Sequence, residues 1–329
     1  MKRALITGIF GQDGSYLAEL LSRMDYEVHG IPRPSPSEHS LKIQTYLAQK
    51  GVTPIVHKCD LSCFADVRGL IKTVTPDECY HLASVHYPAQ TLLETQLKHD
   101  RVLFKQHTLS VLNLLYAIRE TSPETRFVLA GSCLMYDDCQ FSPQSEATPF
   151  RSKSVYGLSK ITGHQLTDLF RNSYNLHTST AILYNHESPR RQPHFVTRKI
   201  VQGLIKVKRG QMQCLELGNL DSVKDWGYAG DYARGMWLMA QADSPRDYIL
   251  ATGIGHTVED FVRETAHLLD LRNWREAVSV KDGLTRPLEH VTLIGNSQRA
   301  QMELSWTHSL TFRQLIELMV QQELEGALD

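Results

Sequence analysis

Residues 3–21 read RALITGIFGQDGSYLAELL and indicate how the fold begins. A short apolar run is followed by three glycines at three-residue spacing and then by apolar residues at helical spacing, which predicts a strand, a tight turn and a helix. Glycines let the backbone approach a diphosphate, and the helix N-terminus supplies unpaired N–H groups. A turn that only packs helix on strand is the alternative, but this position favours a dinucleotide site. Its candidate residues are Gly8, Gly11, Gln12, Asp13 and Gly14.

The first half of the chain continues this alternation of short apolar runs and helical patterns, as βαβ units on a parallel sheet do. The predicted strands are Arg3–Thr7, Tyr26–Ile31, Pro54–His57, Cys79–Ala83, Arg126–Ala130 and Thr178–Tyr184. The predicted helices between them are Ser15–Arg23, Ala65–Thr73, Gln106–Glu120 and Ser154–Asn172. We therefore expect a doubly wound, Rossmann-type α/β fold whose strands are apolar on both faces.

The pattern changes after about Tyr184, where a loop precedes a predicted helix from Phe195 to Arg209. We expect residues 1–184 to form the cofactor domain and residues 185–329 to form mainly a smaller α/β substrate lobe. Segments between 225 and 251 are apolar enough to return to the main sheet, so the lobe is predicted to be discontinuous in sequence.

The composition of the 329-residue chain is that of a globular protein, with 42% hydrophobic residues and a net charge of -1. This balance does not favour nucleic acid or an anionic membrane as a partner. The sequence shows neither a signal peptide nor an apolar run long enough for a membrane helix, which predicts a cytoplasmic protein. Six irregularly spaced cysteines without a CxxC pair suggest reduced thiols, and the lack of an HExxH-like pair argues against a metal site.

The end of the second predicted strand bears on the choice of cofactor. NAD enzymes usually place an acidic residue there for the ribose hydroxyls, but this chain has Arg33. A guanidinium suits a 2′-phosphate, so we expect NADP rather than NAD, although Arg33 could also be a solvated loop residue. The further cofactor candidates at strand ends are Asp60, Leu61, Leu82 and Ala83. Asp60 could equally cap the following helix.

Tyr156 and Lys160 form a YxxxK pair on one face of a predicted helix, and Ser132 follows a strand about 25 residues upstream. A lysine cation stabilises a phenolate, which can take a proton from a sugar hydroxyl while hydride leaves the same carbon. Ser132 can donate to the same oxygen. These three residues are the predicted catalytic set of a short-chain dehydrogenase, and Tyr156 and Lys160 also flank the expected cofactor.

Five runs of the sequence closely resemble the GDP-mannose 4,6-dehydratases, which are extended short-chain dehydrogenases/reductases. The runs are LITGIFGQDGSYLAELL (Leu5–Leu21), TPFRSKSVYGLSK (Thr148–Lys160), LYNHESPRRQPHFVTRKI (Leu183–Ile200), LGNLDSVKDWGYAGDYARGMWLM (Leu217–Met239) and RPLEH (Arg286–His290). The resemblance implies that a GDP-hexose binds in the smaller lobe. The residues that it implies for guanosine or diphosphate binding are Asn185, Val196, Lys199, Asn219, Lys224, Arg286 and Glu289.

The reaction centre departs from the family pattern. In the family, the strand before the active site ends in a sequence like STSELYG, whose Glu abstracts the carbon-5 proton, whereas residues 131–137 here read GSCLMYD. Ser132 can replace the family's Thr, but Leu134 stands where the Glu should be and cannot transfer a proton. Losing a positioned general acid or base typically costs about 100- to 10000-fold in rate, so elimination of water should be impaired.

The expected sugar pocket also differs from the family. The family's AAQSHV turn reads ASVHYP at residues 83–88, and the next segment is about five residues longer. His86, Tyr87 and Asp137 are therefore candidates for new substrate contacts, with structural or surface roles as the alternative. His107 stands where relatives often have an Asn that supports the catalytic lysine through a water.

These observations leave three functions open. The leading hypothesis is an epimerase or oxidoreductase acting at carbon 4 of a GDP-sugar, because hydride transfer should survive the loss of the Glu. The second is a 4,6-dehydratase in which Asp137 or His86 has taken over the role of the Glu, and the third is a cofactor-binding protein without catalysis. The resemblance implies a dimer or tetramer built on helices Gln106–Glu120 and Ser154–Asn172. A homodimer is favoured because residues 34–39 read PSPSEH and lack the basic residues with which the family reaches a neighbour's NADP.

Overall fold

The computed structural model describes residues 1–84, 93–281 and 292–326, and for residues 93–96 only the backbone. Seven parallel strands form the main sheet in the order β10-β6-β5-β4-β1-β2-β3. Their bounds are β1 Arg3–Thr7, β2 Glu27–Ile31, β3 Ile55–Val56, β4 Glu78–His81, β5 Arg126–Ala130, β6 Thr178–Leu183 and β10 Tyr248–Leu250. The order reverses between β1 and β4, and the region outside the carboxyl ends of these two strands, called the crevice below, is where other doubly wound sheets bind their ligands.

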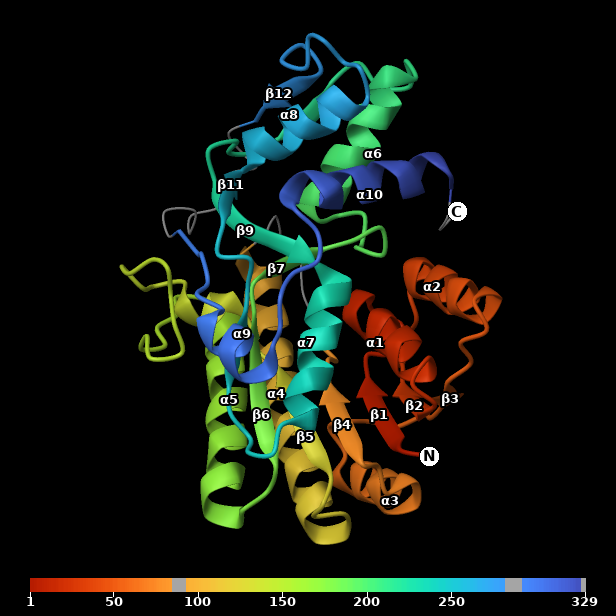
Figure 1. The fold of residues 1–329 in the computed structure, drawn as a ribbon, viewed down its shortest axis with the longest axis vertical. Helices are drawn as coiled ribbons and strands as arrows, with labels where there is room; N and C mark the ends of the chain where they lie inside the picture. Colours follow the sequence, from red (N-terminus) through yellow and green to blue (C-terminus); the bar gives the residue numbers. More distant parts are fainter. Residues whose placement is uncertain (85–92, 282–291, 327–329) are drawn as a thin grey trace.

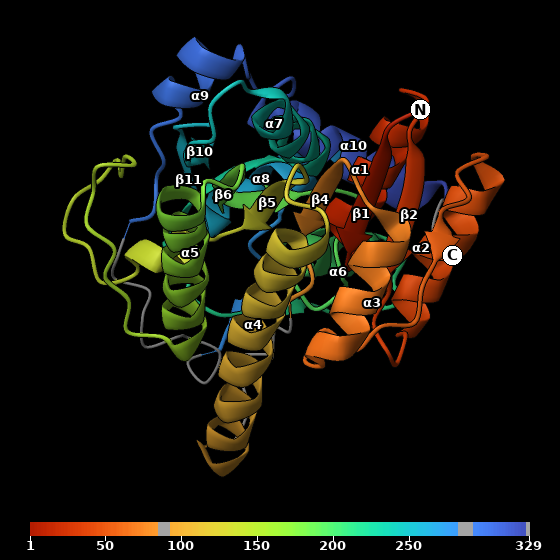
Figure 2. The ribbon, with the colours of Figure 1, turned by 90° about the horizontal axis from the view of Figure 1, so that it is seen from below.

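Helices cover both faces of this sheet (Figure 2). One face carries α3 (Phe64–Val74), α4 (Leu93–Thr121) and α5 (Val155–Tyr174). The other carries α1 (Gln12–Ser22), α2 (Glu38–Gln49), α7 (Ala229–Gln241) and α9 (Gln298–Leu304). Strand β1 shows why both layers form, since Leu5 packs toward α3 and α4 while Ala4 and Ile6 pack toward α1 and α7. Burying a leucine or isoleucine in this way contributes about 1.5–3 kcal/mol.

A smaller lobe lies at the carboxyl ends of the strands (Figure 1). Its helices are α6 (Val196–Lys208), α8 (Val258–Leu268) and α10 (Phe312–Leu324), which bury Trp226, Phe261 and Met319 in a separate core. Its small sheets are β11-β9-β7, from Gly255–Thr257, Val223–Tyr228 and Asn185–Glu187, and β12-β8, from Val278–Val280 and Leu215–Leu217. Strand β10 and helix α9 lead back to the main sheet.

The structure confirms the Rossmann-type sheet and adds elements that the sequence did not predict. Helix α2 follows the proline-rich loop and begins where the Ser37 side chain accepts a hydrogen bond from the N–H of Ser40. Helix α4 begins at Leu93 instead of Gln106, and residues 97–106 are mostly exposed and so carry no apolar period. This end of α4 projects from the body of the molecule (Figure 2).

The described residues contain no helix with the length and apolar character needed to cross a bilayer. All six thiols are free. Over the same described ranges, no group of His, Cys, Asp and Glu side chains is arranged to hold a metal ion.

Candidate active site

The glycine turn lies at the carboxyl end of β1, in the crevice next to β4. Gly8 has a φ of +74°, which only glycine adopts readily, and a Cβ there would lie 3.1 Å from the backbone of Ala83. A Cβ on Gly14 would lie 2.4 Å from the carbonyl oxygen of Gly8, so the first turn of α1 can pack this closely only with glycine. Gly11 is the N-cap of α1 and has no side chain to occupy the N–H groups of that turn. The turn thus has the open cradle that a dinucleotide diphosphate requires.

Thr7 connects this turn to the loop after β4. Its Oγ1 accepts hydrogen bonds from the N–H groups of Leu82 (3.1 Å) and Ala83 (3.0 Å), so its own proton is donated to Nδ1 of His81 (2.8 Å). Burial, together with the charge of Lys160, lowers the pKa of His81 to about 3, which keeps this imidazole neutral. Two of the predicted cofactor residues, Leu82 and Ala83, are therefore held beside the glycine turn.

Gln12 and Asp13 join α1 to the segment that begins the smaller lobe. The Gln12 amide donates to the backbone oxygen of His186 (3.0 Å) and accepts from the hydroxyl of Ser188 (2.8 Å). Oδ1 of Asp13 lies 3.0 Å from Nε2 of His186. His186 was absent from the sequence prediction, although it lies in the NHESPRR run whose first residue, Asn185, was included. Direct hydrogen bonds thus connect the predicted cofactor turn, at Gln12 and Asp13, with the predicted substrate segment that begins at Asn185.

Asp13 and His186 form an ion pair when the imidazole is protonated. Burial by itself would raise the pKa of Asp13 and lower that of His186, but the attraction and hydrogen bond between them reverse both effects. The pKa of Asp13 is consequently lowered and that of His186 raised. A protonated His186 offsets the carboxylate charge in the first turn of α1, and the turn can then accept an anion.

The other predicted cofactor residues lie around the same crevice. Arg33 is exposed beyond β2 and donates to the backbone oxygen of Ser84 (3.2 Å), which keeps its guanidinium at the crevice edge. Asp60 is also exposed and accepts from the N–H (2.9 Å) and hydroxyl (2.8 Å) of Ser62, two bonds that lower its pKa. The backbone oxygen of Leu61 accepts from the amide of Asn113 (2.9 Å).

The predicted catalytic residues lie on α5 and on the turn after β5. The Lys160 ammonium donates to the backbone oxygen of Ala130, at the end of β5 (2.9 Å), and lies 5.6 Å from the ring centroid of Tyr156. Tyr156 is half-buried in the first turn of α5. Oγ of Ser132 accepts from the N–H of Leu134 (3.2 Å) and so begins the short helix Cys133–Tyr136. This arrangement suits proton transfer by Tyr156, with Lys160 as the neighbouring cation.

Leu134 lies directly against the helix that carries Tyr156. A Cβ on Gly157 would fall 2.3 Å from the Leu134 carbonyl oxygen and 2.1 Å from Oγ of Ser152. Only a glycine after Tyr156 allows this approach. The side chain of Leu134 is partly buried and packs against the apolar cluster containing Cys133 and Tyr184, so it brings no acid or base to the turn.

Asp137 does not suit the role of a relocated acid or base. Its side chain is buried, and both carboxylate oxygens are occupied, one by the N–H of Lys153 (2.6 Å) and the other by the hydroxyl of Ser154 (2.8 Å). The Ser154 hydroxyl in turn accepts from the N–H of Gly157 (3.0 Å) and caps α5. Asp137 therefore positions the start of the helix that carries Tyr156.

His107 is buried beside the catalytic tyrosine, with its ring edge-on to that of Tyr156 at 5.7 Å between centroids. The Ser159 hydroxyl donates to the backbone oxygen of Tyr156 (2.7 Å), so it must accept from Nδ1 of His107 (2.9 Å). The other ring nitrogen lies 3.2 Å from the hydroxyl of Ser84. The structure thus connects His107 to α5 through Ser159.

The predicted nucleotide-sugar residues lie on several elements of the smaller lobe. Asn185 and Lys224 are on the neighbouring strands β7 and β9, and Val196 and Lys199 are on the first turn of α6. The Lys199 ammonium donates to the backbone oxygen of Glu216 (2.7 Å). Asn219 accepts from the N–H of Asp221 (2.9 Å). The remaining candidates lie outside the described residues: His86, Tyr87, Arg286 and Glu289.

Comparison with known proteins identifies the family. The model of the GDP-mannose 4,6 dehydratase family matches residues 5–319. GDP-mannose 4,6 dehydratase 2 of Arabidopsis thaliana is 39% identical over 334 residues, covering 99% of this chain and 88% of the relative. GDP-mannose 4,6-dehydratase of Vibrio cholerae is 35% identical over 357 residues and covers 99% and 94% of the two chains.

Solved structures share the fold at much lower identity. UDP-glucose 4-epimerase of Thermotoga maritima superposes with a TM-score of 0.84 at 17% identity, covering 98% of this chain and 99% of its own. dTDP-glucose 4,6-dehydratase of Bacillus anthracis, solved in complex with NAD, gives 0.83 at 16% identity, covering 99% and 97%. Together with the match over nearly the whole sequence, these findings show that the chain belongs to the GDP-mannose 4,6-dehydratase family.

Proposed function

We propose that this protein is a GDP-hexose-modifying dehydrogenase/reductase that uses NADP, acts at carbon 4 of the sugar and does not eliminate water. The observation that carries the proposal is the active-site turn. Tyr156, Lys160 and Ser132 are arranged for proton transfer, while Leu134 supplies no acid or base and both oxygens of Asp137 are bonded elsewhere. The family relationship supports a GDP-sugar as the substrate class.

In the proposed reaction Tyr156 takes the proton of the sugar 4-hydroxyl, Lys160 stabilises the phenolate and Ser132 donates to the same sugar oxygen. NADP, when bound, would accept the hydride of carbon 4. The glycine turn would hold its diphosphate and Arg33 its 2′-phosphate. In an epimerase, the 4-keto sugar turns over in the site, carbon 4 regains the hydride on its opposite face and the sugar oxygen regains its proton from Tyr156, so the reaction is redox-neutral. In a 4-oxidoreductase, the keto sugar is released or captured from solution.

A second candidate function is 4,6-dehydration, which is favoured by the activity for which the relatives at 35% and 39% identity are named. It needs another group in place of the missing Glu. Asp137 fits this role poorly for the reasons given above, which leaves His86, outside the described residues, as the candidate from the sequence.

Incubation with GDP-mannose and NADP in heavy water distinguishes the two functions by mass spectrometry and proton NMR. The proposed function predicts a product of unchanged mass with new sugar signals, or a 4-keto sugar that retains all its oxygen atoms. Loss of one water with deuterium at carbon 5 would establish dehydration and refute the proposal. Under the proposed function, Leu134→Glu should introduce water loss that the wild type lacks, with Leu134→Gln, which has no general base, as its matched control.

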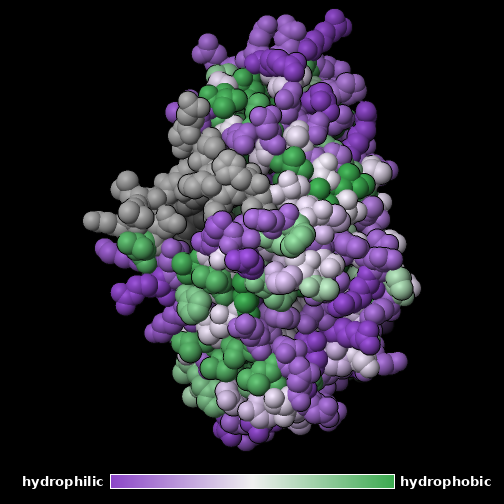
Figure 3. Space-filling view, turned by 90° about the vertical axis from the view of Figure 1, so that its left-hand side faces the viewer, coloured by the Kyte–Doolittle hydropathy of each residue, from purple (hydrophilic) through white to green (hydrophobic). Residues whose placement is uncertain are grey.

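The proposed assembly is a homodimer formed through α4 and α5, which pack side by side on one face of the sheet (Figure 1). Both helices expose large apolar side chains to solvent, including Phe104 on α4 and Leu158 and Leu169 on α5. Figure 3 shows hydrophobic surface among hydrophilic residues on the side of the molecule where α5 lies. Light scattering of the wild type and of Leu169→Lys measures whether this surface holds two copies together.

A further inference from the structure

Asp225 joins three segments that are distant in sequence. It lies on β9 next to Lys224, is fully buried, and accepts four hydrogen bonds. One oxygen accepts from the N–H (2.9 Å) and hydroxyl (2.6 Å) of Thr252. The other accepts from the N–H groups of Gly253 (2.9 Å) and Gly295 (3.2 Å). The carboxylate thus fixes the end of the β10 segment and residues 292–296 onto β9.

Gln144 holds the same residues 292–296 from the opposite side. It is fully buried in the loop between the catalytic turn and α5. Its backbone N–H donates to Ile294 (2.8 Å), its backbone oxygen accepts from Asn296 (2.8 Å), and its side-chain amide donates to the backbone oxygen of Thr292 (3.1 Å). The amide oxygen accepts from the hydroxyl of Tyr184 (2.7 Å).

These contacts connect the predicted nucleotide site to the catalytic turn. Residues 292–296 directly follow 282–291, which contain two predicted GDP contacts, and Leu293 pairs with Lys224, a third. The loop that carries Gln144 runs from Ser132 to Tyr156. The charge of Lys224 also acts on this turn. Burial raises the pKa of the Cys133 thiol to about 12, and the positive charge of Lys224 partly offsets that rise.

We propose that Asp225 and Gln144 are positioning residues. By holding residues 292–296 between β9 and the loop from Ser132 to Tyr156, they fix the position of the predicted GDP contacts relative to Tyr156. The proposal rests on the proposed function, since it assigns a role within the same GDP site. Neither residue needs to touch the substrate. A carboxylate that accepts from three backbone N–H groups fixes segment positions in a way that an apolar side chain of similar size could not.

Two near-isosteric substitutions break the junction. Asp225→Asn turns an amide toward N–H groups that need an acceptor, and Gln144→Glu turns a carboxylate oxygen toward the backbone oxygens of Thr292 and Phe141. The matched control is Asp231→Asn. Asp231 is also a buried aspartate, and it accepts from the N–H (2.7 Å) and hydroxyl (3.0 Å) of Ser309, away from residues 292–296.

The experiment measures binding of GDP and, separately, of NADP to the full chain by calorimetry, with Tm recorded for each variant. We expect Asp225→Asn and Gln144→Glu to weaken GDP binding by about tenfold or more and to leave NADP binding unchanged. Asp231→Asn should lower Tm while leaving both affinities intact. This split separates positioning from a general loss of stability, which would not act on one ligand alone.

Four other outcomes each decide against one of the two proposals. If folded Asp225→Asn and Gln144→Glu bind GDP like the wild type, or lose both ligands equally, the positioning role is wrong. Should both variants fail to fold, Tyr184→Phe removes only the donor to Gln144, and unchanged GDP affinity in that variant counts against the role. A wild-type chain that binds NADP but not GDP overturns the proposed substrate class instead.

Discussion

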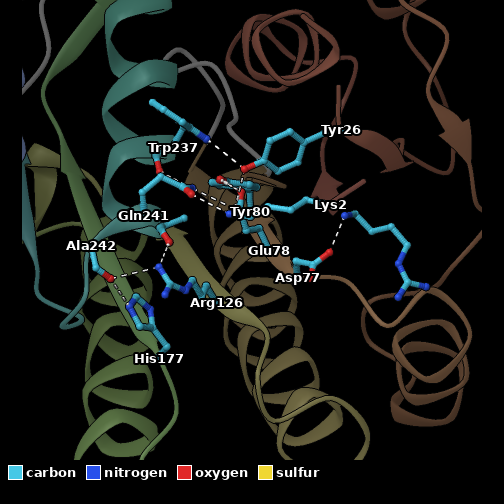
Figure 4. A network of polar contacts seen from close by, with 12 residues as sticks. Lys2, Tyr26, Asp77, Glu78, Tyr80, Arg126, His177, Trp237, Gln241 and Ala242 are labelled. Atoms are coloured by element: carbon cyan, nitrogen blue, oxygen red, sulfur yellow. Dashed lines mark hydrogen bonds and ion pairs between the residues drawn. The ribbon is translucent and has the colours of Figure 1, made fainter. Parts of the chain in front are cut away.

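The two ends of the main sheet use polar residues differently. At the amino end, buried Glu78 accepts hydrogen bonds from Lys2 (3.1 Å), Tyr26 (2.8 Å), Gln241 (3.0 Å) and Tyr80 (2.6 Å), as Figure 4 shows. At the carboxyl end, the Lys160 ammonium has one hydrogen-bond acceptor among the described residues, the backbone oxygen of Ala130, although an ammonium has three donors. The N-terminal turn of α1 is likewise capped by no side chain.

This comparison shows why a network of polar residues is not by itself a functional site. The amino end even has a pocket of about 510 Å³, lined in part by Lys2, Asp77 and Arg126. Arg126 is held by the backbone oxygens of Ala240 (2.7 Å) and Ala242 (3.2 Å), so it serves to join β5 to the end of α7. At the carboxyl end, the uncapped N–H groups of α1 and the remaining donors of Lys160 can bond a ligand. We therefore expect substitutions at the amino end to affect stability and those at the carboxyl end to affect turnover.

The sharpest test compares the loss of one tyrosine hydroxyl at each end. Tyr156→Phe removes the proposed proton acceptor, so kcat should fall by about 100- to 10000-fold with little change in Tm. Tyr26→Phe removes one donor to Glu78 and should cost about 1 kcal/mol of unfolding free energy without changing kcat. Turnover of the GDP-sugar by NMR and urea denaturation measure the two effects. Equal kcat values for Tyr156→Phe and wild type would invalidate the catalytic assignment.

The second test removes the centre of the amino-end network. Glu78→Ala leaves four donors without their acceptor, and the free energy of unfolding should drop by about 3 kcal/mol because buried donors lose their partners. Glu78→Gln keeps one acceptor oxygen and should cost less. Urea denaturation gives the stability, and calorimetry with NADP should show an unchanged affinity. A weakened NADP affinity in the folded variant would contradict the division between the two ends.

The third test concerns the contact between Gly157 and Leu134. Gly157→Ala places a Cβ 2.3 Å from the Leu134 carbonyl oxygen, so the first turn of α5 must shift together with Tyr156. A displacement of this kind typically costs about 100-fold in kcat. Gly163→Ala is the control on the same helix, because its Cβ would meet only side-chain atoms of Leu129 (3.2 Å) and Val111 (3.5 Å). Matching kcat values for the two variants would show that the contact does not position Tyr156.

The smallest effect concerns the pH dependence of the ion pair between Asp13 and His186. The pKa of His186 is raised above 6.5, so its contribution to stability is complete below that pH and is lost as pH rises through the raised value. The pKa of Asp13 is lowered below 3.8, so its contribution is present above that pH and is lost on acidification through the lowered value. The Tm difference between wild type and Asp13→Asn should therefore be largest between pH 3.8 and 6.5. A difference that does not vary with pH would argue against the ion pair.

The sequence alone determined the main sheet and the glycine turn at the carboxyl end of its first strand. Apolar period and glycine spacing are local properties, and they predicted β5 at its observed bounds, Arg126–Ala130, and the turn of Gly8, Gly11 and Gly14 after β1. These two patterns did not predict α2 or the start of α4, because a mostly exposed helix has few apolar residues at helical spacing.

Only the tertiary structure decided which polar groups become partners. Asp13 and His186 are 173 positions apart, and Asp225 and Gly295 are 70 apart, so no local pattern could pair them. The sequence likewise made Asp137 a candidate for a new substrate contact, whereas the fold directs both of its oxygens to the start of α5. The physical reason is that hydrogen bonds form between atoms about 3 Å apart, a distance set by how helices and strands pack and not by their order along the chain.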